Sequence, residues 1–130
     1  MNECMEAKRE IAEKFMPCAK AIAALGNEAR MRIVLALLHA PERGLRVGAV
    51  AERVHMSRPS ATHHLAILKE AGLVSVLKEG TKNFYYMDAD PELWGRLAAL
   101  FSEISETVRW ADEEGYPFGS CAAAEKEQIV

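Results

Sequence analysis

The hydrophobic period of the chain changes from helical to extended within residues 47–87, and this change constrains the fold more than any other feature. Two segments with helical spacing are followed by two β-rich segments: 47–54, 58–71, 73–78 and 82–87. A tight turn at His55-Met56 separates the two helices, and Glu79-Gly80-Thr81 joins the two strands. The stretch therefore predicts a helix-turn-helix followed directly by a β-hairpin.

The second of these helices carries its own start and stop signals. Ser57 suits an N-cap, Pro59 lies in the first turn where its missing N–H costs nothing, and Gly72 suits the residue that ends the helix. The residues expected to face the core are Ala61, Leu65 and Leu68. The residues expected to face away from it are Arg58, Pro59, Thr62, His63, Ala66 and Lys69, with His64 at the boundary.

Three further helices are predicted around this stretch. The first covers residues 3–24, where Pro17 either kinks the helix or starts a second one, and its apolar positions are Met5, Ile11, Phe15, Ala19 and Ile22. The next covers 28–38, is capped by Asn27, and has an apolar face of Met31, Val34, Leu35 and Leu38. The last covers 90–110, and its apolar stripe is too wide for one contact: Leu93, Trp94, Leu97, Leu100, Phe101, Ile104 and Val108.

These boundaries predict four parts of the chain. We expect an N-terminal helix (1–25), a helix-turn-helix core with its hairpin (26–88), a C-terminal helix (89–110) and an acidic, loosely ordered tail (111–130). The predicted fold class is mainly α with a β-hairpin wing, an α+β fold of the winged helix-turn-helix type.

Charge is unevenly distributed along the chain. The 130 residues include 16 basic and 19 acidic side chains, a net charge of −3, which by itself speaks against nucleic acid as a partner. Residues 26–88, however, hold nine basic and six acidic side chains, net +3, whereas residues 89–130 hold three and nine, net −6. Because phosphate binding depends on the potential within about 10 Å at 0.1 M salt, the basic middle is the relevant part. On charge alone, a solvated surface of mixed sign is the better explanation of the pattern, so the interpretation depends on the structure that the basic middle forms.

Composition argues against several other classes of protein. Half of the residues are hydrophobic and 27% are charged, which is typical of a globular domain. No apolar run approaches the roughly 18 residues of a membrane span, and the first residues do not form a secretory signal, so no membrane partner is expected. Three scattered cysteines argue against a disulfide scaffold and for a reducing cytoplasm. The chain has no glycine-rich phosphate loop, nucleophile elbow or paired buried carboxylate, so we do not expect an enzyme.

The outward face of the 58–71 helix suits the major groove of DNA. Its Arg, Ser, Thr and His side chains can donate to phosphates or to base edges, and the hairpin tip can reach a neighbouring phosphate strand or the minor groove. The predicted DNA-binding residues are Ser57, Arg58, Pro59, Ser60, Thr62 and His63 on the helix, and Lys78, Thr81, Lys82 and Asn83 on the wing. Arg58 and His63 are assigned to base edges, and Thr62 and the lysines to phosphates.

Three stretches of the chain resemble the ArsR/SmtB family of bacterial winged-helix repressors: LGNEARMRIVLALL, SRPSATHHLAILKEAGLV and KEGTKNFYYMD. The resemblance covers about residues 22–108. It implies a cytoplasmic homodimer with its interface on the first and last helices, and one recognition helix per subunit in an inverted-repeat DNA operator. It also implies that an effector lowers DNA affinity. The wide apolar stripe of the last helix independently favours a homodimer, since one side can pack on its own core and the other on a symmetry mate.

Metal-sensing members of that family use two kinds of site, and this chain has the ligands of neither. The thiol pair of the first kind would fall at Arg46 and Gly48, so both thiols are missing. The second kind keeps its spacing here, but carboxylates replace every imidazole, at Asp90, Glu92, Glu103 and Glu106. Such a set would suit Ca²⁺, Mg²⁺ or Mn²⁺ better than Zn²⁺, Ni²⁺ or Co²⁺. Acidic residues also belong at a helix start and on its wet face, which is the simpler interpretation.

The cysteines offer another hypothesis for an effector site. Cys4 and Cys18 lie on or near the first helix and Cys121 lies beyond the last, so the three could converge at one edge of a dimer. Three thiolates suit a soft ion such as arsenite, Cd²⁺ or Cu⁺, and two could form a redox disulfide or carry a persulfide modification. A solitary cysteine is more often a small buried hydrophobe. His63 and His64 point about 100° apart on a helix and cannot grip one ion together.

Two functions of different classes therefore remain open. The first is a DNA-binding transcriptional repressor that acts as a homodimer on a double-stranded operator. The second is a winged-helix protein-interaction module that does not bind DNA. Retention on random DNA that falls steeply with salt would separate them, because counterion release accompanies phosphate binding.

Overall fold

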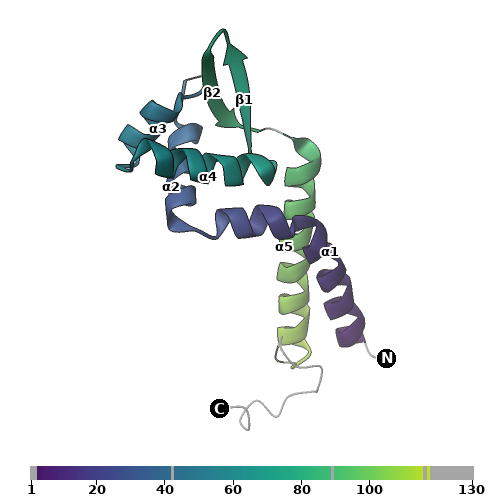
Figure 1. Ribbon diagram of the computed structural model, residues 1–130. Coiled ribbons are helices and arrows are strands. Elements are labelled where there is room, and N and C mark those ends of the chain that lie inside the picture. Colours follow the sequence, from purple (N-terminus) through teal and green to yellow (C-terminus); the bar gives the residue numbers. More distant parts are fainter. Residues whose placement is uncertain (1–2, 42, 89, 116, 118–130) are drawn as a thin grey trace. The chain divides into compact units, whose positions relative to one another are not determined.

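The computed structural model describes residues 3–41, 43–88, 90–115 and 117. Within them it contains five helices and one antiparallel hairpin (Figure 1): α1 (Glu3–Leu25), α2 (Glu28–Leu38), α3 (Val47–Arg53), α4 (Arg58–Glu70), β1 (Val74–Glu79), β2 (Lys82–Met87) and α5 (Pro91–Glu113). The order confirms the predicted mainly α architecture with a β-hairpin wing. α5 continues to Glu113, beyond the predicted end at Trp110. Most of the tail predicted for 111–130 lies outside the described residues.

The chain divides into two compact units, and each is described by itself. The first unit combines the chain up to Cys18 with the chain from Glu92 onward, and the second is Ala19–Pro91. The division differs from the predicted boundary at 25/26, because the end of α1, which buries Ala21 and Ala24, belongs to the second unit. The helix α1 continues through Pro17, so no second helix starts there.

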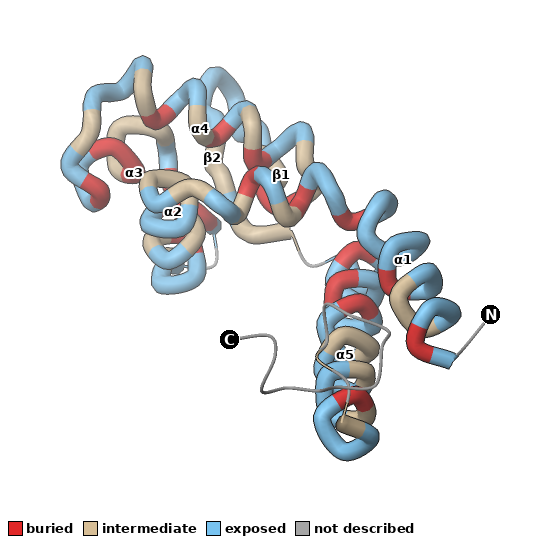
Figure 2. The backbone as a smooth tube through the Cα atoms, turned by 90° about the horizontal axis from the view of Figure 1, so that it is seen from below, coloured by how far each residue is buried: buried red, intermediate tan, exposed pale blue. Residues whose placement is uncertain are grey.

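The core of the second unit forms around α4. Ala61, Leu65 and Leu68 are fully buried, as their spacing predicts, and buried positions recur along α4 between exposed ones (Figure 2). The other core positions of the helix-turn-helix and the first strand are Ile33, Leu37, Val50, Ala51, Val54, Leu73 and Val74. Gly72 follows the C-cap of α4 with φ 82°, a left-handed conformation that glycine adopts without strain. The core thus fixes which face of α4 meets solvent.

The buried face of α2 differs from the predicted one. Ile33 and Leu37 are buried, whereas Met31, Leu35 and Leu38 of the predicted face are exposed. Both sets are apolar and both have helical spacing, so the period of the sequence could not select between them. Contacts of α2 with α3, α4 and β2 select the Ile33 side.

The hairpin projects beyond the helices of its unit (Figure 1). Its register pairs Val74 with Met87 at the base and Glu79 with Lys82 at the tip. The turn is therefore the two-residue loop Gly80-Thr81, in which Gly80 has φ 61°. Leu45 adds an isolated bridge to Tyr85, with N···O distances of 2.8 and 2.7 Å. This bridge ties the loop before α3 to the wing.

In the first unit, α5 has two apolar sides. Its buried side consists of Leu93, Leu97, Leu100 and Ala111, and its other side exposes Trp94, Phe101 and Val108. α1 buries Cys4, Ile11 and Cys18 but exposes Met5, Phe15 and Met16, so Met5 and Phe15 of the predicted stripe do not face the core. Lys14 forms an ion pair with Glu103 that connects the two helices. Among the described residues, no helix is long and apolar enough to cross a membrane.

Candidate nucleic-acid interface

The start of α4 is fixed by its cap and by the turn that precedes it. Ser57 has extended backbone angles, and its Oγ accepts a hydrogen bond from the Ser60 amide at 3.2 Å. Pro59 lies in the first turn, where a helix leaves its N–H groups without internal partners. In the preceding turn His55 has φ 55°, a left-handed conformation that is rare for a residue other than glycine. The first turn of α4 is thus presented in one orientation.

The face of α4 predicted to meet DNA is exposed in the structure. Six of its residues are solvent-exposed: Ser57, Arg58, Pro59, Thr62, His63 and Lys69. Ser60 is half-buried instead, with its amide bound to the cap. Buried Ala61 and Leu65 lie on the opposite face. The exposed N-terminal turns therefore form a polar surface that carries donors for phosphates or base edges.

The wing places four predicted contact residues together at its tip. Lys78, Thr81, Lys82 and Asn83 are all exposed. Lys78 pairs with Asn83 and Lys82 with Glu79 in the register of the hairpin. The Arg43 guanidinium lies 3.6 Å from the carboxylate of Glu79, the acidic residue of the tip. Arg43 is therefore an additional cation at the wing, and it was not among the predicted contact residues.

Arg30 links α1, α2 and α4 through a cluster of hydrogen bonds that no sequence pattern predicts. Its Nε donates to the Ala24 carbonyl at 2.7 Å, and its amide donates to the Asn27 side chain at 3.0 Å. Its Nη1 lies 3.3 Å from His64 Nδ1. Because a guanidinium only donates, Nδ1 must accept, so the His64 proton resides on Nε2. Burial, followed by the charge of Arg30 and by His63, lowers the pKa of His64 below its ordinary value.

The lowered pKa of His64 predicts that the fold becomes less stable in mild acid. The unfolded chain binds this proton at a pKa near 6.5, before the folded chain does. Stability therefore falls as pH decreases from about 7 through the lower pKa of the folded state, and is constant below it. His64→Gln should flatten the pH dependence of the urea midpoint between pH 7.5 and 5. The exposed His39 supplies the control His39→Gln, which should leave the profile unchanged, and equal slopes in all three proteins would contradict the prediction.

Arg58 does not extend along the exposed face of α4. Its guanidinium lies against Gly48 of α3: a Cβ placed at Gly48 would be 2.7 Å from Nη2 and 3.0 Å from Cζ. Arg46 and Arg58 line the same hollow of about 520 Å³, whose wall also includes Glu52, Gly44 and Phe84. Arg46 and Arg58 thus share one open recess between the start of α3, the start of α4 and the wing.

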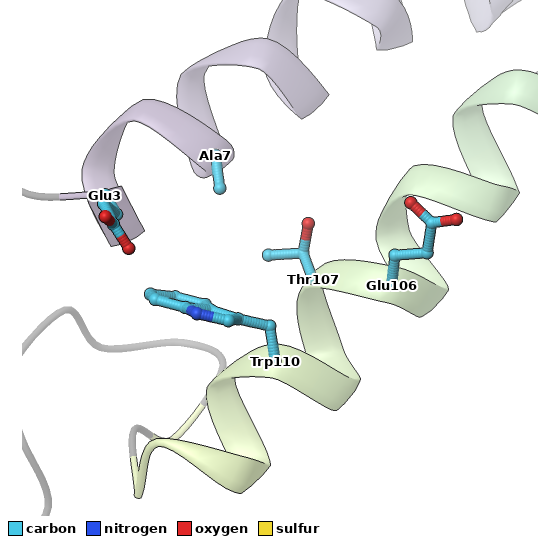
Figure 3. A pocket seen from close by; sticks show the side chains of 5 residues that line it. All are labelled: Glu3, Ala7, Glu106, Thr107 and Trp110. Carbon is cyan, nitrogen blue, oxygen red and sulfur yellow. The ribbon is translucent and has the colours of Figure 1, made fainter.

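The described residues do not bring the predicted effector ligands together in one site. Among the described residues, no group of three or more His, Cys, Asp or Glu side chains is arranged to hold a metal ion. Of the acidic set, Glu92 pairs with Arg96 and Glu103 with Lys14, and Lys14 holds the pKa of the Glu103 carboxyl below its ordinary value. Glu106 lines a hollow of about 260 Å³ with Glu3, Ala7, Thr107 and Trp110 (Figure 3).

The cysteines differ in state. Cys18 is a free, buried thiol, whereas Cys4 is disulfide-bonded. The odd cysteine count therefore does not exclude a disulfide. Cys121 lies outside the described residues, so a thiol sensor stays a prediction.

Comparison with known proteins identifies the family. Residues 25–76 match a family model described as a helix-turn-helix domain. An HTH-type transcriptional regulator of Methanocaldococcus jannaschii is 37% identical over 78 residues, which cover 60% of this chain and 85% of that protein. An HTH-type transcriptional regulator of Mycobacterium tuberculosis is 39% identical over 62% of this chain and 68% of that protein.

A solved structure narrows the family further. A homodimeric winged helix-turn-helix DNA-binding domain from Mycobacterium bovis, described as a possible ArsR-family regulator, matches with a TM-score of 0.55 and 29% identity, over 73% of this chain and 83% of that chain. The chain belongs to the ArsR family of transcriptional regulators. Membership of the ArsR family confirms the predicted winged helix-turn-helix fold and the predicted class of protein, a transcriptional regulator.

Proposed function

We propose that this ArsR-family regulator is a cytoplasmic homodimeric repressor that binds an inverted-repeat DNA operator through α4 and the wing. The observation that carries the proposal is the exposed first half of α4, which the Ser57 cap and the buried Leu65 hold in one orientation. A major groove admits one such helix, and the wing tip supplies Lys78 and Lys82 for the flanking phosphates. The alternative, a protein-interaction module without DNA binding, gives no reason for this concentration of donors.

The dimer is supported by an apolar side of α5 that is exposed among the described residues. Trp94, Phe101 and Val108 are 37%, 55% and 42% exposed, and they recur every seven residues along one stripe. A seven-residue repeat is the pattern by which two helices pack along each other. The related domain from Mycobacterium bovis is a homodimer. We propose that a second copy of this chain covers the stripe, together with exposed Phe15 and Met16 of α1.

Selection of binding sites from random DNA tests this function. A homodimer with one recognition helix per subunit should enrich sequences with two inverted half-sites whose centres lie about one helical turn, or a multiple of it, apart. The selection uses the full chain at low salt and counts enriched sequences after several rounds. Enrichment of a single unpaired half-site would contradict the dimeric mode. Failure to retain any DNA below physiological salt would favour the protein-interaction module instead.

A further inference from the structure

The backbone conformation at Gly48 is helical and could be adopted by any residue. Gly48 is the second residue of α3 and, unlike Gly44 and Gly72, it has no positive φ. Glycine is a poorer helix former than alanine, with a cost of about 1 kcal/mol in a helix interior and less in a first turn such as this one. Because the backbone does not require glycine here, we expect that the missing side chain of Gly48 leaves space for a neighbouring group.

The neighbour is the guanidinium of Arg58. Three of its atoms lie 2.7, 3.0 and 3.2 Å from the position a Cβ would take at Gly48: Nη2, Cζ and Nε. Real Cβ atoms essentially never approach other atoms within 3.0 Å, so any larger residue here must displace the guanidinium. The displaced group is the far end of a flexible side chain, and its movement leaves the core intact.

Arg46 lines the same recess as the guanidinium of Arg58. Within the part of the chain that the structure describes, neither arginine forms an ion pair or a side-chain hydrogen bond with a protein acceptor. Two arginines and one acidic residue, Glu52, line this open hollow beside the first turn of the recognition helix, and neither arginine forms an ion pair with Glu52. The excess of guanidinium groups suits a tetrahedral dianion or phosphodiester. The hollow of about 520 Å³ is roomy enough for such a group with bridging water.

We propose that Gly48 is a positioning residue, which seats Arg58 beside Arg46 so that the two arginines clasp one phosphate of the DNA backbone. The inference rests on the proposed DNA binding and assigns Arg58 to a phosphate instead of to a base edge. It also explains why α3 accepts a glycine at a helical position. Arg58 then fixes the register of α4 in the groove, and His63 is left to contact bases.

A double-mutant cycle tests the proposal with a random-sequence 24-base-pair duplex as the probe. Gly48→Ala, Arg58→Ala and the double variant are titrated by fluorescence anisotropy at several salt concentrations. Gly48→Ala should weaken binding roughly 3- to 10-fold, and Arg58→Ala should flatten the slope of log K against log salt by about 0.9 per contact. In the Arg58→Ala background, Gly48→Ala should have no further effect, because its whole effect acts through the guanidinium.

Thermal unfolding separates this role from a structural one. Gly48→Ala should keep or raise the Tm while it weakens DNA binding, because alanine is the better helix former. Gly95→Ala is the matched control: it is also a helical glycine, and nothing lies within 4 Å of its added Cβ. It should keep or raise the Tm and leave DNA affinity unchanged.

Three results would overturn the proposal while the proposed function stands. The first is a Gly48→Ala protein that binds DNA with wild-type affinity. The second is a loss of DNA affinity from Gly48→Ala that is equally large in the wild-type and the Arg58→Ala backgrounds. The third is a loss of affinity in Arg58→Ala that occurs on the selected operator but not on random DNA. A wild-type protein that binds no DNA at all would refute the proposed function itself.

Discussion

Phe101→Glu is expected to convert the protein from a dimer to a monomer and to weaken operator binding by about 100-fold or more. Phe101 is the most exposed of the three large side chains on the exposed apolar stripe of α5 and lies midway between Trp94 and Val108. In a two-fold symmetric interface the substitution places a carboxylate from each copy in an apolar contact, and the burial of each charge opposes association. A monomer contacts only one half-site of the operator. It therefore loses the gain in affinity that comes from holding a second recognition helix close to the other half-site.

Sedimentation equilibrium measures this effect directly, because the chain mass is 14.4 kDa and a dimer has twice that mass. Ser102→Glu is the matched control: it introduces the same charge one residue along α5, about 100° around the helix from Phe101. This control should remain dimeric and bind DNA like the wild type. A Phe101→Glu protein that stays dimeric, with unchanged DNA affinity, would show that the dimer uses another surface.

His63→Ala and Lys82→Ala are expected to weaken DNA binding in two distinguishable ways. His63 is exposed on the second turn of α4, so its removal should cost about 1–3 kcal/mol on a selected operator and almost nothing on random DNA. Lys82 is exposed beside the wing turn and is assigned to a phosphate. Its removal should weaken binding to both DNAs by a similar factor and flatten the salt slope by about one.

Paired titrations of the selected and a scrambled duplex distinguish the two roles. Each variant is measured on both duplexes at three salt concentrations, beside Glu70→Ala as a control on the exposed end of α4, away from its first turns. Equal losses on both duplexes for His63→Ala would reassign this histidine to the backbone. Unchanged salt dependence in Lys82→Ala would remove the wing lysine from the phosphate contacts.

The parts of the interface that the sequence predicted are those fixed by local chemistry. The Ser57 cap, the proline in the first turn and the spacing of Ala61, Leu65 and Leu68 determine where α4 begins and which face it exposes. The β-rich segments around Gly80 likewise determine the hairpin, because a two-residue turn fixes its register. These signals act over a few residues and do not depend on the rest of the fold, so the sequence alone is enough to predict them.

The parts that could not be predicted depend on contacts between distant residues. The bond between Arg30 and His64 spans 34 positions, and the single bridge from Leu45 to Tyr85 has no periodic pattern. The seat of Arg58 depends on a glycine in another helix, which by itself predicts only a weak helix. The faces of α2 are apolar on both sides, so packing alone decided between them.

Backbone NMR of the ¹⁵N-labelled full chain, titrated with the selected operator duplex, tests most directly whether α4 and the wing form the DNA-binding surface. We expect the largest amide shift changes in residues 57–63 and 78–83, with a second group around Arg46 and Gly48. Changes concentrated on the exposed stripe of α5, with α4 and the wing unaffected at saturation, would contradict this prediction.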